Sequence, residues 1–442
     1  MIKKIISVFI LMVVLGQSVL AYDYTNLNLE FFNKFNDDNL NYYINSALEN
    51  NHELKKTEYV IEQYRQQVKY SFSKELPTFS VGANYLGIHT PKFGSYGLSD
   101  NAFVLPFVAS YEADFLLKNR DKTKSYKKSY EAATYEQKAV YLSLLSDLAT
   151  VYTNILQYEN LISNQRKIVS NNEKILLHSQ KLFNHGIIST SELNNSKKQV
   201  EDSKAQLNKL EKEQKILLIQ LAILSGISPA NYNDFKYGNL NNFEYSGTIP
   251  DEIASDIIFS RPDVMAAEAK LEKAKIDIRV ARKEFFPRFN ITGVWAFNTI
   301  FPGNFFSWES SLALLLAGAT QDIFQGGRKV ANLRFQKAKY EELFEDYKQT
   351  DLNAIKEVNT ALCFVKYDTN TEKNVRQKLS YQNTNFQNEQ KKYNRGIISA
   401  IEILESENQK LAVKNELTKA KTQKLINYFT LYKAVGGKLW RK

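Results

Sequence analysis

The chain has 442 residues, and its 58 Lys and Arg exceed its 48 Asp and Glu to give a formal net charge of +10. Lysines alternate with glutamates along helical stretches, and no basic block or nucleic-acid motif occurs, so the charge indicates a solvated helix surface and no nucleic-acid partner. The single cysteine, Cys363, excludes an internal disulfide and follows no cleavage site, so it offers no lipid-modified N-terminus. It is predicted to pack inertly within a helix.

The first 21 residues are predicted to be a cleaved signal peptide. Lys3 and Lys4 precede an apolar run from Ile5 to Leu15, and Val19-Leu20-Ala21 has the small-x-small pattern of a secretory cleavage site. The alternative is a retained anchor, but the run is shorter than the roughly 20 residues of a spanning helix. No later segment is predicted to be a transmembrane helix.

The rest of the chain is a tandem duplication. One short phrase occurs twice, as Phe183–Ser189 and Tyr393–Ser399, and its glycines, Gly186 and Gly396, lie 210 positions apart. The same offset aligns further pairs: Pro77 with Pro287, Phe79 with Phe289, Val81 with Ile291, Tyr85 with Trp295 and Gly226 with Gly436. Two copies of one supersecondary unit are therefore expected.

Each copy contains one predicted β-hairpin, over 77–116 and 287–324. Apolar and polar residues alternate in both first strands, which indicates strands with one apolar, aromatic-rich face. The first return strand alternates from Phe103 to Phe115. The second, roughly Trp308 to Phe324, has leucines at successive positions, so only the repeat predicts a strand there.

Long helices follow each hairpin. Neither Arg120–Asn184 nor Arg328–Asn394 contains proline or glycine, and a helix of that length measures about 100 Å. Apolar residues recur every seven positions in the first: Leu148, Ile155, Ile162, Val169, Leu176 and Phe183. This heptad predicts coiled-coil packing. Further helices are expected after each repeated phrase, and before the hairpins over Leu40–Glu75 and from Pro250 to Glu284.

These elements divide the chain into seven segments. The signal peptide occupies 1–21, and an N-terminal segment with its helix occupies 22–76. The first hairpin spans 77–116, the first coiled-coil helices 117–226, an inter-repeat segment with its helix 227–286, the second hairpin 287–324, and the second coiled-coil helices with the C-terminal segment 325–442.

Aromatic-faced strands beside such long helices indicate a protein that meets both lipid and water. Strands in lipid must close into a barrel, because an open edge leaves backbone groups unpaired. Membrane barrels have about eight or more strands, so four strands per chain require an oligomer. The alternative is a soluble sandwich, which fits poorly beside helices of this length.

The residues before the second hairpin resemble a family signature. Ser260–Val264 reads SRPDV, Ala266–Glu268 reads AAE, and Ala281–Pro287 reads ARKEFFP. With the glycine phrases and Phe324–Arg328 (FQGGR), the chain resembles the TolC-like outer-membrane efflux factors over nearly all of its mature length. The Arg261-Pro262-Asp263 signature is typical of one subgroup.

This resemblance implies a fold and a set of partners. The fold is an α+β membrane protein, a homotrimer with a 12-stranded outer-membrane barrel, four strands from each chain, continued by a periplasmic α-helical coiled-coil tunnel. The implied partners are outer-membrane lipid, a periplasmic adaptor (membrane fusion) protein at the helix tip and an inner-membrane transporter. No cofactor is implied.

Three departures from the family pattern concern local structure. Many relatives in the subgroup carry a lipidated N-terminal cysteine, which is not found here. Leu117 stands where relatives usually have glycine, and Asp322 where a proline is common. The last two leave the local turn geometry open but not the fold.

The resemblance also assigns a gate near the repeated phrase. Glu402 and Glu405 lie at positions where the family has pore-facing carboxylates; in a trimer they would form rings that attract cations and raise one another's pKa. The alternative is ordinary exposed glutamates. Glu192 and Tyr393 match a carboxylate and a tyrosine that help to hold neighbouring coiled coils shut. Ile398 replaces a basic residue that assists in some relatives.

The repeated phrase would form the adaptor-docking tip, with Gly186 and Gly396 ending the helices. His185 is matched by Arg395, which indicates either an exposed basic turn or an adaptor contact. The four histidines have no metal-ligand spacing, and neither a nucleophile elbow, a P-loop nor a dinucleotide motif occurs, so no metal site and no enzyme activity are expected.

Three functions remain open from the sequence. The first is the exit duct of a tripartite efflux system for small toxic compounds, which the Arg261-Pro262-Asp263 signature favours. The second is an outer-membrane channel for type I protein secretion. The third is a periplasmic coiled-coil structural protein without a pore. The substrate is not predicted, although Met265 is the single methionine of the mature chain and no methionine-rich path for soft metals occurs.

Overall fold

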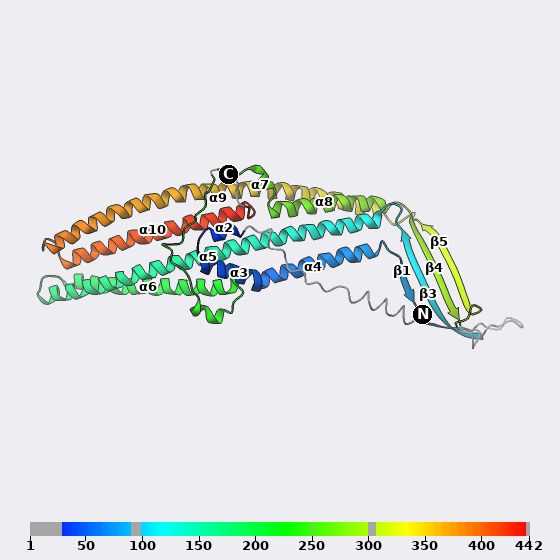
Figure 1. Ribbon diagram of the computed structural model, residues 1–442, viewed down its shortest axis with the longest axis horizontal. Helices are drawn as coiled ribbons and strands as arrows, with labels where there is room; N and C mark the ends of the chain where they lie inside the picture. Colours follow the sequence, from blue (N-terminus) through cyan, green and yellow to red (C-terminus); the bar gives the residue numbers. More distant parts are fainter. Residues whose placement is uncertain (1–28, 90–98, 251, 299–305, 439–442) are drawn as a thin grey trace.

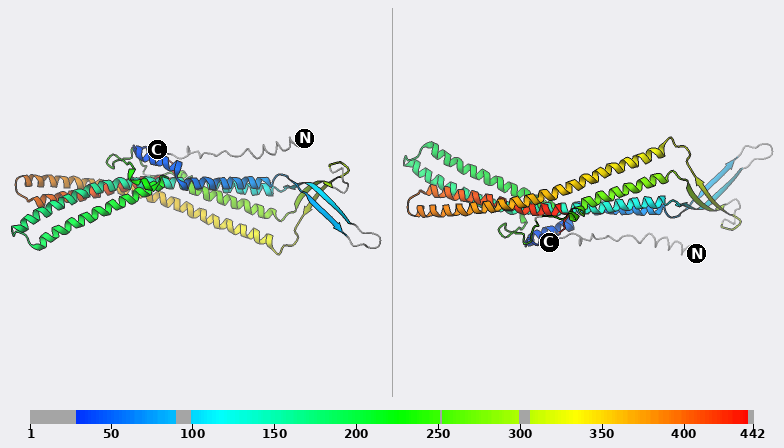
Figure 2. Two further views of the ribbon diagram at one scale, coloured as in Figure 1. Left: turned by 90° about the horizontal axis from the view of Figure 1, so that it is seen from below. Right: turned by 90° about the horizontal axis from the view of Figure 1, so that it is seen from above.

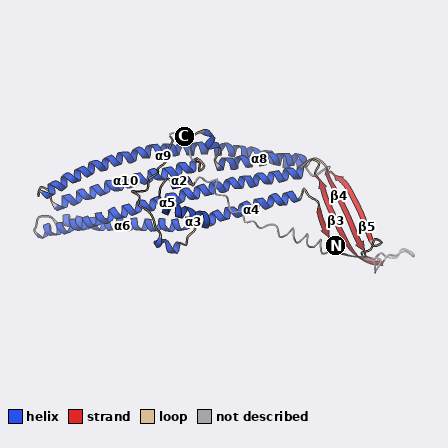
Figure 3. Cartoon of the chain, viewed as in Figure 1, coloured by secondary structure: helices blue, strands red, loops and turns tan. Residues whose placement is uncertain are grey.

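A computed structural model describes residues 29–89, 99–250, 252–298 and 306–438, so the predicted signal peptide lies outside the described residues. The described chain is a rod of long helices with a sheet at one end (Figure 1). Figure 3 shows the same division, with helices along the body and strands confined to that end.

The duplication extends to the helix boundaries. Helix α4 (His52–Ser73) corresponds to α8 (Pro262–Lys283), and both have 22 residues. The 67-residue α5 (Lys118–Asn184) corresponds to α9 (Arg328–Asn394), and the 35-residue α6 (Thr190–Leu224) to α10 (Ala400–Ala434). Each boundary recurs after 210 positions, so the predicted long helices are confirmed.

The helices predicted before the hairpins are each divided in two. The first consists of α3 (Asp38–Asn50) and α4, because the Asn51 side chain accepts hydrogen bonds from the N–H groups of Glu53 and Leu54 and so begins a new helix. The second consists of α7 (Ser255–Phe259) and α8, which begins at Pro262. Proline suits a first helical position, where its missing N–H costs no bond.

The main apolar core lies midway along the rod, where the short α2 (Glu30–Asn33) and α3 pack with α5 and α10. Phe31 stacks on Tyr432 with ring centroids 4.4 Å apart, and both rings are fully buried or nearly so. The 3₁₀ helix η2 (Pro229–Asp234) and the loop after it add Phe243 to this core. Segments from both repeats are therefore joined at mid-height.

The coiled-coil prediction for α5 is supported only at the first three positions of its apolar heptad. Leu148, Ile155 and Ile162 are buried, but Val169 is only partly buried. Towards the tip many of the buried positions are polar: Asn164, Gln165, Asn171, Asn172 and Ser179. Polar residues cannot be recognised as buried from a hydrophobic repeat, so the sequence gives no sign of this amide-rich interface with α6 and α10.

The sheet has the strand order β1-β3-β4-β5, with every described pair antiparallel: β1 (Thr78–Val81), β3 (Ser99–Ala113), β4 (Arg288–Asn298) and β5 (Ser311–Thr320). Strand β2 (Asn84–His89) also pairs with β3 and continues the register of β1. The first predicted strand is interrupted opposite Pro106, which has no N–H to donate. The sheet is therefore four strands wide.

One face of the sheet carries exposed aromatic side chains. Phe79 is opposite Ala109, which is opposite Gly293, and Phe107 is opposite Trp295, so these residues share a face. Phe79 is 80% exposed and Trp295 48% exposed. The predicted aromatic face is thus present in the chain and uncovered by its own helices.

The register of β5 explains why its sequence does not show which face is apolar. Leu315 lies opposite Gly293 on the aromatic face, whereas Leu316 lies opposite Thr292 on the other face. Leu312, Leu314 and Leu316 are exposed on that second face, which Ser80, Ser110 and Thr292 also share. Leucines on both faces leave no alternation to read.

One smaller expectation is wrong: Cys363 is exposed on α9 and is not packed against other side chains. Among the described helices, α5 alone is long and apolar enough by composition to cross a membrane. Most of that apolar stretch is buried against other helices, as in the core helix of a helical bundle.

Candidate functional site

The two copies of the repeated phrase lie at the same end of the rod, opposite the sheet (Figures 1 and 2). One forms the turn between α5 and α6, and the other the turn between α9 and α10. The structure therefore brings together at one tip the predicted residues Gly186, Gly396, His185, Arg395, Glu192, Tyr393, Glu402 and Glu405.

Glycine ends both long helices in the same way. Gly186 and Gly396 have φ angles of 73° and 71°, in the left-handed region that a side chain disfavours. The N–H of Ile187 donates to the Leu182 carbonyl at 2.9 Å, and Ile397 donates to Lys392 at 3.0 Å. These bonds satisfy the last carbonyls and reverse the chain, as the repeated phrase predicts.

Two of the predicted carboxylates cap the helices that follow. The backbone N–H of Ser399 donates to Glu402 Oε2 at 2.7 Å, and the N–H of Glu402 donates to Ser399 Oγ at 3.2 Å. Ser189 and Glu192 make the same two bonds. These reciprocal bonds are capping boxes. The spacing Ser-x-x-Glu in both repeated phrases is a sequence signal for a capping box. The family resemblance assigns these glutamates to a gate and does not indicate this second role.

Capping also fixes the electrostatics of these two groups. The pKa of Glu402 lies below its ordinary value, mainly because the Ser399 backbone donates a hydrogen bond to it and secondly because the Ser399 side chain does so. Ser189 lowers the pKa of Glu192 in the same way. Both carboxylates are fully exposed in the single chain. Any rise in pKa through a ring of like charges would therefore start from a lowered value.

The other tip residues have few partners within the chain. Among the described residues, the Glu405 carboxylate forms no hydrogen bond or ion pair, and nothing bonds Tyr393 to Glu192. Tyr393 is 40% exposed. His185 and Arg395 are both exposed at the turns, directly before the glycines. The gate and docking roles of these residues remain predictions.

The signature residue Arg261 lies far from the tip and connects three helices. It is 6% exposed, and its Nη1 donates to the carbonyl of Ala434, the last residue of α10, at 2.8 Å. Its other nitrogens bond Asp263 at 3.0 and 2.7 Å and Glu357 on α9 at 2.6 Å. Pro262 begins α8. The signature therefore holds α8, α9 and α10 together.

A buried carboxylate joins the helices near the sheet, and no local sequence pattern distinguishes it from other acidic residues. Asp121 on α5 accepts from Lys283 Nζ at 2.7 Å and lies 3.5 Å from Arg279, both on α8. Burial alone would raise its pKa, but the hydrogen bonds and charges of Lys283 and Arg279 together outweigh burial and hold the pKa below its ordinary value. Its partners belong to the segment before the second hairpin, so the contact links the two repeats.

The chain matches the family model described as outer membrane efflux protein twice, over residues 43–226 and 253–437. The chain belongs to the outer membrane efflux protein family. The two matches correspond to the two halves of the duplication, and they include both tips and the Arg261 signature. The suspected resemblance to TolC-like channels is confirmed.

Curated relatives of the chain come from several export systems. It is 23% identical to the cation efflux system protein CusC of Escherichia coli K12 over 424 residues, 94% of this chain and 90% of the relative. It is 24% identical over 412 residues to the probable outer membrane lipoprotein SilC of Salmonella typhimurium, covering 92% and 87%. The pyoverdine export outer membrane protein OpmQ of Pseudomonas putida is 24% identical over 341 residues, covering 74% and 69%.

Solved channels have the same fold. The CmeC outer membrane channel of Campylobacter jejuni superposes with a TM-score of 0.86 at 23% identity, covering 96% of this chain and 90% of that one. The open-state MtrE outer membrane channel of Neisseria gonorrhoeae gives 0.80 at 22% identity, covering 90% and 89%. The protein is therefore an outer-membrane efflux channel component with a large periplasmic portion, and not an enzyme.

Proposed function

We propose that the chain is the exit duct of a tripartite efflux system that passes small toxic compounds to the exterior. The observation that carries this proposal is the exposed aromatic face on a sheet that is open at both edges. Within the described residues, the β1/β2 edge and β5 are each paired on one side only. In hydrocarbon such edges must find partners, because unpaired backbone groups cost several kcal/mol each.

Three copies would complete the barrel. A sheet four strands wide gives 12 strands in a homotrimer, which is within the range of membrane barrels. The helices would then continue as a tunnel of about 100 Å through the periplasm. A sheet that packed against its own helices would support the structural alternative, but Phe79, Phe103 and Trp295 are all exposed.

The tip is proposed to be the gate and the docking site. Three copies of Glu402 and Glu405 would place two rings of carboxylates around the axis, and carboxylate rings favour cations. His185 and Arg395 at the turns would meet the periplasmic adaptor, which in turn contacts the inner-membrane transporter. Tyr393 and Glu192 of neighbouring coiled coils would hold the gate shut.

Two experiments test this function. The mature protein should fractionate with the outer membrane and form ion-conducting channels in planar bilayers, whereas a monomer soluble without detergent would exclude a pore. Deletion of the gene should increase sensitivity to some antibiotics, bile salts, dyes or metals. Loss of a secreted protein without any such sensitivity would instead support type I secretion.

A further inference from the structure

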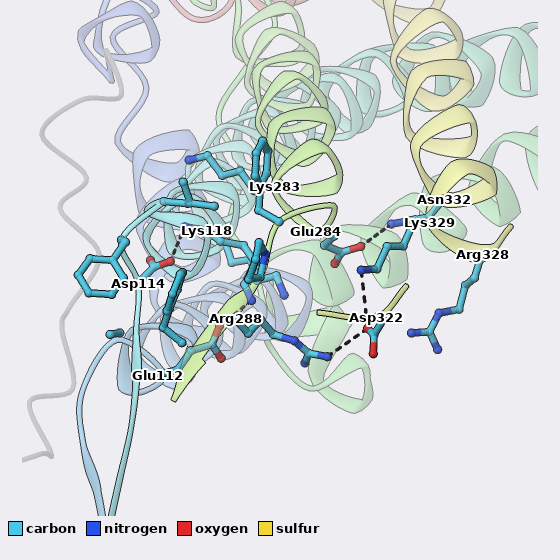
Figure 4. A pocket seen from close by; sticks show the side chains of 17 residues that line it. Glu112, Asp114, Lys118, Lys283, Glu284, Arg288, Asp322, Arg328, Lys329 and Asn332 are labelled. Carbon is cyan, nitrogen blue, oxygen red and sulfur yellow. Dashed lines mark hydrogen bonds and ion pairs between the residues drawn. The ribbon is translucent and has the colours of Figure 1, made fainter. Parts of the chain in front are cut away.

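A cavity of about 460 Å³ lies where the strands meet the helices. It lies between the ends of β3 and β4 and the ends of α5, α8 and α9, so both repeats contribute to it (Figure 4). It is at the opposite end of the rod from the gate, and no gating residue lines it. Nothing in the channel function described above requires a cavity here.

Cations outnumber carboxylates in this cavity. Six basic residues line it: Lys118, Lys122, Lys283, Arg288, Arg328 and Lys329. The four carboxylates are Glu112, Asp114, Glu284 and Asp322. The lining is therefore rich in donors and basic overall, the composition that anionic ligands require.

The carboxylates are already occupied by other groups. Glu112 pairs with Lys118 at 2.6 Å, and Asp322 lies 3.5 Å from Arg288 and 3.7 Å from Lys329. Asp114 accepts from the backbone N–H of Lys118 at 2.6 Å. Little negative charge remains for further cations.

Glu284 accepts from Asn332 at 3.1 Å, as Figure 4 shows. In the part of the chain that the structure describes, the side chains of Lys122 and Arg328 form no hydrogen bond or ion pair. Burial and the charge of nearby Lys118 lower the pKa of Lys122, because they outweigh the attraction of Glu284 and Glu112. Burying an ammonium group that forms no direct ion pair is costly, and a bound anion would reduce that cost.

An apolar rim adjoins the cations. Phe115 is 74% exposed and Phe286 54% exposed, and both line the cavity. Phe115 contacts Phe289 edge to face, with ring centroids 5.2 Å apart. Cations beside exposed aromatic rings at the end of the strands suit a molecule with an anionic head and an apolar tail.

We propose that this cavity binds the phosphate group of a membrane phospholipid, with Lys122 and Arg328 as the principal ligands and Phe115 and Phe286 in contact with its acyl chains. The inference rests on the proposed function in one respect, because it assumes that the strands cross the outer membrane. The cavity then lies at the level of the periplasmic leaflet. Free inorganic phosphate offers the same head-group chemistry without the apolar part.

The test compares two double variants of the full-length channel in detergent. Lys122→Gln with Arg328→Gln removes both unpaired cations. Arg334→Gln with Lys337→Gln is the matched control, because both residues are exposed on α9 and neither lines the cavity. Native mass spectrometry would measure binding of dihexanoyl phosphatidylglycerol below its micelle concentration, and separately of inorganic phosphate.

The pocket variant should bind the short-chain lipid at least about tenfold more weakly, because two charge-assisted hydrogen bonds are lost. The control should bind it like the wild type, and Lys122→Arg with Arg328→Lys should retain most of the affinity. Equal binding by the pocket variant, or equal weakening in the control, would overturn the site. Inorganic phosphate binding as tightly as the lipid would overturn the lipid assignment.

Conductance of the wild type in planar bilayers keeps the two proposals separate. If the wild type conducts but the pocket variant binds the lipid as tightly as the wild type does, the result contradicts the lipid site alone. A protein that forms no channel contradicts the proposed function.

Discussion

The side-chain amide of Asn51 donates from Nδ2 to the carbonyl oxygen of Leu224 at 2.9 Å. The equivalent link occurs 210 positions later, where Arg261 Nη1 donates to the carbonyl oxygen of Ala434 at 2.8 Å. In each repeat, the residue before the helix that leads to the sheet thus binds the last carbonyl of the helix that returns from the tip. A glycine follows each return helix, and a Cβ on Gly226 would lie 2.5 Å from the Asn50 backbone.

The stability of the second repeat should depend more strongly on this contact, because its donor is the charged guanidinium of Arg261. Replacing Arg261 with Ala should lower the free energy of unfolding by about 2–3 kcal/mol, since it leaves the Ala434 carbonyl without its donor and removes the cation shared by the partly exposed Asp263 and Glu357. Denaturant unfolding of the detergent-purified channel would measure the change.

Arg261→Lys should recover only part of that loss, because an ammonium group cannot donate in three fixed directions. Arg334→Ala on α9 is a suitable control, since this exposed arginine should contribute within about 0.5 kcal/mol. A loss at Arg261 no larger than that at Arg334 would show that the signature has no structural role.

The sequence predicts the long helices and the tip turns well because local signals determine them. Proline and glycine are absent from α5 and α9, and Gly186 and Gly396 mark where they end. The division at Asn51 could also have been inferred, because the offset of 210 aligns it with Arg261 before Pro262.

Tertiary contacts account for what the sequence did not predict. The side-chain amide of Asn171 on α5 donates to Asn408 on α10 at 3.0 Å. This bond joins the two helices in a stretch where the heptad indicates only apolar packing. The cations around the junction cavity come from four separate segments, so no local pattern groups them. Asp121 is likewise meaningful only beside Lys283, 162 positions away.

Leu117 should be a site where substitution increases stability. It begins α5 with a φ of 57°, whereas Gly327, its counterpart before α9, has a φ of 81°. The turn keeps its left-handed geometry despite the leucine, at a steric cost of roughly 1–2 kcal/mol. Leu117→Gly should therefore raise the free energy of unfolding by about 1 kcal/mol after the entropy cost of glycine.

The reciprocal change supplies the control for that prediction. Gly327→Leu should lower stability by a similar amount, about 1 kcal/mol, because position 327 also requires a positive φ that disfavours a side chain. Thermal melting of both variants would compare them. Destabilisation by Leu117→Gly would mean that the contacts of this half-exposed leucine exceed its backbone strain.

The capping box at Ser399 should weaken in acid. The pKa of Glu402 is lowered in the folded chain from a reference value of 4.5, so the stabilising contact is complete above that value and is lost as the pH falls through the folded pKa. Hydrogen exchange of the amides of Ser399 and Glu402 should lose protection in that range. The loss should appear below about pH 4.5 and not at neutral pH.

Glu402→Gln provides the matched comparison. Its amide oxygen can still accept from the Ser399 N–H but does not titrate. The protection of these two amides, corrected for intrinsic exchange, should then be independent of pH between about 3 and 7. This range is chosen because it includes the pH at which a carboxyl group titrates. Equal pH dependence in both proteins would assign the effect to another group.

The predicted latch can be separated from the capping box by a set of variants. Tyr393→Phe with Glu192→Ala should raise the single-channel conductance in planar bilayers, because loss of the hydroxyl–carboxylate bonds between neighbouring coiled coils would destabilise the closed state. Glu192 also caps α6, however, so fraying of that helix could open the tip by itself. Ser189→Ala breaks the cap but keeps the Glu192 carboxylate.

The latch predicts that Ser189→Ala leaves the conductance low, whereas Tyr393→Phe alone raises it. Tyr381→Phe with Glu201→Ala makes the same chemical change at exposed positions away from the tip and should have no effect. High conductance in Ser189→Ala with no change in Tyr393→Phe would show that the helix cap, and not the tyrosine, keeps the gate closed. The residue that holds the gate is thus decided by which single substitution, at Ser189 or at Tyr393, opens it.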